Sequence, residues 1–153
     1  HSTDRALSLN VTETCARPWP LSNVWIGASV ENQQYADERL PELLRIPAAV
    51  RFVSYEPALG AVDFSRWLDR LSWIIVGGES GTGARPFDIA WARSAVAQCK
   101  AAGVPVFVKQ MGARPVGRDC EHGRAGQPCR YNDPKGGDMA EWPADLRVRE
   151  FPR

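Results

Sequence analysis

Four short apolar segments recur along the chain, and each ends at a charged residue. They are VWIGASVE (residues 24–31), VRFVSYE (50–56), WIIVGGE (73–79) and VPVFVK (104–109). Their lengths, their content of Val, Ile, Phe and Trp, and the Gly, Pro or Asn residues around them are typical of β-strands. The segments between them have helical patterning. The order therefore predicts an α/β fold of about four parallel β/α units.

The intervening segments predict three helices of unequal length. Asn32 can cap the first, whose apolar stripe has helical spacing: Ala36, Leu40, Leu43 and Leu44. Pro41 lies inside this segment and predicts a split into two short helices. A short helix is expected over residues 63–70, with Asp63 as its cap. The longest is expected over residues 88–102, where Gly103 is the C-cap.

Apolar and polar positions alternate along the first strand. One set of side chains is apolar and should pack under helices: Val24, Ile26, Ala28 and Val30. The other set contains a glycine and polar residues, and we expect it to face the opening of the sheet or barrel: Trp25, Gly27, Ser29 and Glu31.

The charged strand ends are the main candidate for a functional site. Glu31, Glu56, Glu79 and Lys109 would share one edge of a parallel sheet, where ligands of such folds bind. Carboxylates there can accept hydrogen bonds from a ligand, bind a cation or act as general bases. The structural alternative is that these strands simply turn polar where they leave the core. The full set of candidate ligand-binding residues is Ser29, Glu31, Ser54, Glu56, Gly77, Gly78, Glu79, Lys109 and Gln110.

Composition sets the limits of this interpretation. The 153 residues predict one domain, with an extension over 1–22, a β/α core over 23–111 and an irregular tail over 112–153. A net charge of +1 gives no support for binding nucleic acid. The sequence contains neither a membrane-length apolar run nor a recognisable signal peptide, so a cytoplasmic protein is expected. The first residue is His1 rather than Met, which leaves open a tag remnant or a fragment of a longer protein.

The cysteines and the glycine-rich loop give weaker signals. The four cysteines form no CxxC pair and are expected to be free thiols. Cys120, His122 and Cys129 are weak metal candidates, because they offer at most three ligands. The loop GGESGTG has neither the spacing of a dinucleotide-binding loop nor a GK[ST] motif, which argues against a nucleotide phosphate site.

Two long stretches within residues 20–112 carry a resemblance: NVWIGASVENQQYADERLPELLRIPAAVRFVSYEPALGAVDF and WIIVGGESGTGARPFDIAWARSAVAQCKAAGVPVFVKQMG. They resemble a phage and prophage family of conserved proteins of unknown function. The closing KGGDMAEWPADLRVREFP is also similar. Members of that family look like radical-SAM proteins. The resemblance implies a partial (β/α) barrel whose N-terminal part carries a CxxxCxxC motif for a [4Fe-4S] cluster that binds S-adenosylmethionine. Gly77–Glu79 loosely resembles the element that receives the amino group of that cofactor.

This chain lacks CxxxCxxC and corresponds to the C-terminal half of such a barrel. We therefore expect a substrate- or cofactor-binding portion that does no radical chemistry by itself, and no cofactor in this chain alone. Its partner would be the missing N-terminal half, another chain or a second copy, and its ligand a small molecule. Two alternatives stay open. One is a small metal-dependent hydrolase that uses Glu31, Glu56 and Glu79, and the other is a non-catalytic module that completes a barrel with a partner.

Overall fold

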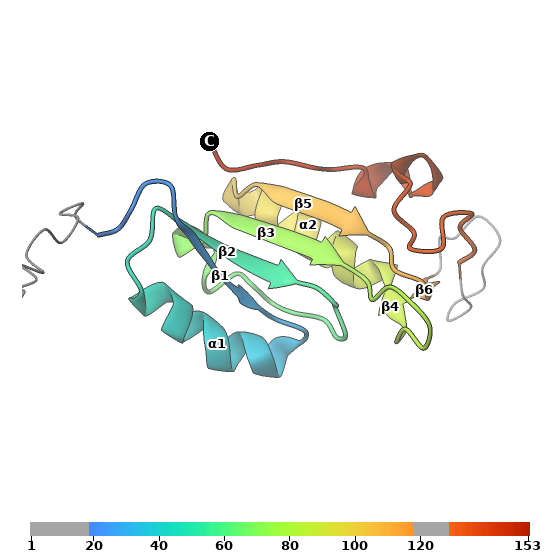
Figure 1. Cartoon of the computed structure of the whole chain (residues 1–153), viewed down its shortest axis with the longest axis horizontal. Helices are drawn as coiled ribbons and strands as arrows, with labels where there is room; N and C mark the ends of the chain where they lie inside the picture. The colour runs from blue at the N-terminus through green and yellow to red at the C-terminus, as the bar shows by residue number, and fades with distance from the viewer. Residues whose placement is uncertain (1–18, 118–128) are drawn as a thin grey trace, which may run out of the picture.

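A sheet of four parallel strands forms the centre of the protein (Figure 1). The computed structural model describes residues 19–117 and 129–153. The strands lie in the order β1-β2-β3-β5, and their bounds are Trp25–Ser29, Val50–Tyr55, Trp73–Gly77 and Val106–Gln110. This arrangement confirms the α/β prediction.

Two α-helices flank the sheet, α1 (Gln33–Arg45) and α2 (Ile89–Ala102). As predicted, the Asn32 side chain accepts a hydrogen bond from the Tyr35 N–H, and Gly103 ends α2 in the left-handed conformation. The predicted split at Pro41 is wrong, because α1 continues through this residue. Pro41 is exposed and removes only one backbone hydrogen bond, while buried side chains on both sides of it hold the helix on the sheet: Ala36, Leu40 and Leu43.

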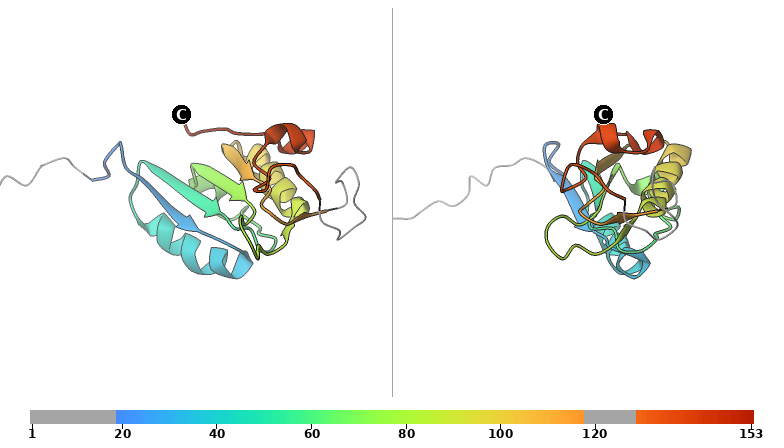
Figure 2. Two further views of the ribbon diagram at one scale, coloured as in Figure 1. Left: turned by 45° about the vertical axis from the view of Figure 1, so that its right-hand side comes forward. Right: turned by 90° about the vertical axis from the view of Figure 1, so that its right-hand side faces the viewer.

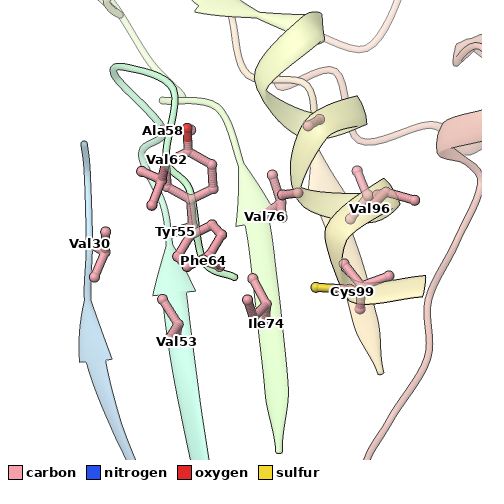
Figure 3. Close-up of a cluster of buried hydrophobic side chains, with 14 of the residues drawn as sticks. Val30, Val53, Tyr55, Ala58, Val62, Phe64, Ile74, Val76, Val96 and Cys99 are labelled. Carbon is pink, nitrogen blue, oxygen red and sulfur yellow. The ribbon is translucent and has the colours of Figure 1, made fainter. Parts of the chain in front are cut away.

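The core lies between one face of the sheet and the segments that cover it. Figure 3 shows Val53, Ile74 and Val76 of the strands near Val96 and Cys99 of α2. The connection from β2 to β3 also covers this face through buried Phe64 and Trp67. Instead of the short helix expected over 63–70, the connection contains only a single 3-10 turn, η1 (Leu68–Arg70). No helix among the described residues is long and apolar enough to cross a membrane.

The other face of the sheet, called the second face below, carries the alternate side chains. Trp25, Gly27 and Ser29 of β1 are exposed there, as the alternation predicted. At the beginning of the strands this face bears rings that contact one another: Trp25, Phe52, Trp73 and Phe107. Gly27 is paired with Phe52, and a Cβ at Gly27 would lie 2.5 Å from the Phe52 ring. Phe52 therefore occupies the space that the missing side chain leaves.

The two edges of the sheet differ. At the β5 edge, the Val108 N–H donates to the Val148 carbonyl and the Glu150 N–H donates to the Val106 carbonyl, so that residues 148–150 run antiparallel beside β5 (Figure 2). This pairing is a single β-bridge between Phe107 and Arg149. At the other edge, β1 pairs only with β2 among the described residues.

Smaller elements complete the fold and were not predicted. The two-residue strands β4 (Phe87–Asp88) and β6 (Pro115–Val116) pair in parallel as a second sheet. The tail contains two 3-10 turns, η2 (Met139–Glu141) and η3 (Ala144–Leu146). Such short elements have no periodicity to detect in a sequence.

The described cysteines differ from expectation. Cys99 is a buried free thiol, but Cys129 is buried and disulfide-bonded. The expectation of four free thiols is therefore wrong for Cys129. The other two cysteines, Cys15 and Cys120, and the candidate His122 lie outside the described residues.

Candidate functional site

The candidate site is the charged rim, which we define as Glu31, Glu56, Glu79 and Lys109. Glu31 and Glu79 follow the last residues of β1 and β3 by two positions, Glu56 follows β2 directly, and Lys109 belongs to the end of β5. Because the strands are parallel, all four residues lie at the same edge of the sheet, where the arrowheads point in Figure 1.

Glu56 and Lys109 form an ion pair that crosses β3. Lys109 Nζ lies 2.8 Å from Glu56 Oε1 and 3.1 Å from Oε2. The two strands that carry these residues are separated by β3, which has Gly77 at this level. A Cβ at Gly77 would lie 3.4 Å from Glu56 Cδ. The absence of a larger side chain on β3 therefore leaves room for the pair.

Glu79 is held by Arg85, in the loop between β3 and β4. Arg85 Nε donates to Oε2 at 2.9 Å, Nη2 donates to Oε1 at 2.8 Å, and the Arg85 backbone N–H donates to Oε2 at 2.8 Å. The side-chain hydrogen bonds from Arg85, followed by the backbone one, lower the pKa of the Glu79 carboxyl to about 2. Glu79 is therefore ionised near neutral pH and closes the loop on itself.

Glu31 is paired with Arg39 of α1. Arg39 Nη1 lies 3.1 Å from Glu31 Oε2, and it also donates to the Ser29 carbonyl at 2.8 Å. The guanidinium lies 4.2 Å from the centre of the Tyr35 ring. Glu31 also acts on Arg85: the pKa of Arg85 is raised first by its hydrogen bond to Glu79, and the charge of Glu31 raises it further. The pairs at β1 and β3 are thus electrostatically connected.

Both glycines of the site are buried, and Gly78 packs against the backbone of Met111 and Gly112. Gly78 donates its N–H to the Gln110 carbonyl at 3.1 Å, and the Gln110 side chain donates to the Gly78 carbonyl at 3.0 Å. A Cβ at Gly78 would lie 2.4 Å from the Met111 carbonyl oxygen. Close approach of two backbone segments therefore requires glycine at this position.

The remaining predicted site residues, Ser29 and Ser54, are register partners on β1 and β2. Their side chains belong to the second face, as do those of Glu56 and Lys109. Sequence reasoning missed Arg39 and Arg85, each of which binds a rim carboxylate. Their signal was weak, because a single arginine in a helix or loop usually points to solvent.

A metal site is not supported by the side chains that are described. Within residues 19–117 and 129–153, no group of three or more His, Cys, Asp or Glu residues is placed to hold a metal ion. Each rim glutamate has a cationic partner of its own instead. This arrangement gives no support to the metal-dependent hydrolase alternative.

The fold and the site define an α/β protein with paired charges at the carboxyl ends of its parallel strands. The chain belongs to a family described as proteins of unknown function (DUF5131), whose model matches residues 2–133. No curated protein and no solved structure matches the chain.

Proposed function

We propose that this chain is the substrate- or cofactor-binding portion of a radical-SAM-like protein of phages and prophages, equivalent to the C-terminal half of a (β/α) barrel. The observation that carries the proposal is the Glu56–Lys109 pair at the carboxyl end of a parallel sheet. In such folds, this edge is where small ligands bind. The pair holds a cation beside the second face, where a ligand can reach it, because the Lys109 side chain is half exposed.

The residues present do not fit a [4Fe-4S] cluster. The sequence has no CxxxCxxC motif, and neither described cysteine is suited to a cluster: Cys99 is in the core and Cys129 is disulfide-bonded. We therefore assign no radical step to this chain. Its contribution is to bind and orient a small molecule.

The Gly77–Glu79 element fits the amino group of S-adenosylmethionine poorly. Both oxygens of Glu79 already accept hydrogen bonds from Arg85, and the Gly78 carbonyl accepts one from Gln110. A ligand ammonium could bind there only by displacing these donors. This favours ligand binding at Lys109 over binding at Glu79.

A second candidate function, an interaction module, is favoured by the β1 edge. A parallel sheet is ordinarily covered on both faces, and an unpaired strand edge is a place where another strand can add. Among the described residues, β1 has no neighbour on its outer side, and Trp25 of this strand is exposed on the second face. Light scattering tests this alternative, and a chain that stays strictly monomeric would contradict it.

The binding proposal is tested by titrating the ¹⁵N-labelled chain with a panel of small molecules, S-adenosylmethionine included, and following backbone amide shifts. We expect at least one compound to shift the amides of residues 29–31, 54–56, 77–79 and 109–110 together. Glu56→Gln and Lys109→Met should change that binding, whereas Glu42→Gln, in an exposed pair on α1, should not. Binding elsewhere, or none from any class of compound, would overturn the proposal.

A further inference from the structure

We propose that the ligand of the charged rim carries an anionic group, a carboxylate or a phosphate, which binds to the cations Arg39, Arg85 and Lys109. The inference rests on the proposed function and names the class of ligand that this function requires. It is carried by the way in which the three ion pairs use their hydrogen-bonding groups.

The carboxylate oxygens of the rim are already engaged. Both oxygens of Glu31 face Arg39 Nη1, at 3.3 and 3.1 Å. Both oxygens of Glu56 face Lys109 Nζ, and those of Glu79 accept three hydrogen bonds from Arg85. A cationic ligand would therefore have to compete with a cation that is held in place at each carboxylate.

The cations, in contrast, keep unused donors. A guanidinium has five N–H groups and an ammonium has three. Arg85 bonds Glu79 through Nε and Nη2, which leaves Nη1, and Arg39 uses only Nη1 among the described residues, which leaves Nε and Nη2. Lys109 donates a hydrogen bond to Glu56 Oε2 and lies 2.8 Å from Oε1, which leaves at least one of its three N–H groups. Each of the three cations therefore keeps N–H donors that a ligand can use.

The cations of the three pairs are also more exposed to solvent than the carboxylates. The carboxylate side chains of Glu31, Glu56 and Glu79 are 20%, 18% and 30% exposed. Their partners Arg39, Lys109 and Arg85 are 40%, 52% and 57% exposed. A ligand that approaches from solvent therefore contacts the cations first. The less exposed carboxylates hold these cations in position. Charge-assisted hydrogen bonds from such fixed donors favour carboxylate and phosphate groups.

The positions of the pairs limit the size of the ligand. Four strands at a spacing of about 4.8 Å make the sheet about 14 Å wide. Arg39 lies at the β1 side and Lys109 at the β5 side, while Arg85 is influenced by Glu31 as well as Glu79. One small anion can therefore bind at one side of the sheet, and a ligand that contacts both sides needs two anionic groups separated by about the width of the sheet.

The experiment uses the same amide-shift titration at about 0.15 M salt, which weakens non-specific attraction. The probes are pyrophosphate, malate, putrescine and glycerol. We expect pyrophosphate or malate to shift the amide signals of residues near Lys109. Whichever of the two binds more tightly identifies the anionic group as a phosphate or a carboxylate. Lys109→Met should weaken this binding about tenfold or more, whereas Lys135→Met, in the tail, should leave it unchanged.

Glu56→Gln provides the decisive comparison. It removes the charge that neutralises Lys109 and keeps the shape of the side chain, so anion binding should become several-fold tighter. If putrescine binds at the rim and Glu56→Gln abolishes its binding, the anion proposal is overturned while the proposed binding function stands. If no probe and no compound of the wider panel binds there, both are overturned. The amide spectra of the free variants report whether each remains folded.

Discussion

Glu56 and Lys109 lie on strands that are not neighbours, yet Lys109 Nζ is 2.8 Å from Glu56 Oε1. The intervening strand β3 places Gly77 at this level. The pair therefore depends on three strands at once: two supply the charges, and the third supplies a residue without a side chain. A contact of this kind joins sequence positions far apart and reports whether β2, β3 and β5 are correctly paired.

A double-mutant cycle should detect coupling between these two residues. We expect Glu56→Gln and Lys109→Met together to destabilise the protein less than the sum of the single changes, by about 0.5–1 kcal/mol. Urea unfolding measures the free energies. The exposed pair Glu42 and Arg45 on α1 is the matched control, with an expected coupling of about 0.3 kcal/mol. Equal coupling in both pairs would argue against a special role for the rim pair.

The neighbouring glycines Gly77 and Gly78 should respond differently to alanine. Gly78→Ala places a methyl group against the Met111 carbonyl, where neither backbone segment can easily move, and should cost about 2–3 kcal/mol of unfolding free energy. Gly77→Ala makes only an ordinary contact with Glu56 and should cost much less. Urea or thermal unfolding of both variants tests the prediction, which fails if their stabilities are alike.

The loop that Arg85 closes should open in acid. Because the pKa of Glu79 is lowered from its ordinary 4.5 to about 2, the stabilisation from this pair is fully present above about pH 4.5. It is then lost as the pH falls toward 2. An NMR titration of the Glu79 carboxyl should give the low pKa, and Arg85→Met, which keeps the backbone donor, should raise it toward the ordinary value. A normal Glu79 titration in the unchanged protein would contradict the prediction.

Arg149 should protect the β5 edge. Its guanidinium donates to the carbonyls of Val108 and Lys109 and lies over the Phe107 ring. Arg149→Met should therefore loosen residues 148–150 and speed hydrogen exchange of the Val108 amide, which donates to Val148. The β2–β3 amides serve as the internal reference. Unchanged exchange at Val108 would show that the backbone pairing is sufficient without Arg149.

The Cys99 thiol should be unreactive in the native protein. Burial, with a smaller contribution from the charge of Glu150, raises its pKa to about 12, so little thiolate exists at pH 8. Iodoacetamide should label Cys99 only after unfolding, as followed by peptide mass spectrometry. A cysteine introduced by Ala101→Cys, at an exposed position near the end of the same helix, should react readily and confirm that the reagent is active.

The sequence was sufficient to predict features that depend on local patterns. The four strands were visible because each is short, apolar and bounded by Gly, Pro or Asn, and the caps Asn32 and Gly103 have clear physical reasons. The common edge of the charged rim followed from the parallel order alone. Such features need no knowledge of which side chains meet.

Features that depend on tertiary contacts were less accessible. Pro41 was expected to break α1, but burial on both sides of it outweighs one lost hydrogen bond. Arg39 and Arg85 were missed because their partners are chosen by the fold. The rim was therefore expected to present carboxylates, whereas the structure covers each carboxylate with a cation.

The fit of Phe52 over Gly27 has a consequence for how β1 and β2 align. Sliding β1 by two residues would keep the same set of side chains on the second face, so hydrophobic patterning alone does not forbid that error. After such a slip, however, the Phe52 ring would meet Trp25 or Ser29 instead of the only position in the strand without a side chain. Gly27 thus accommodates the Phe52 ring in the native register of β1 and β2 and disfavours the registers shifted by two residues.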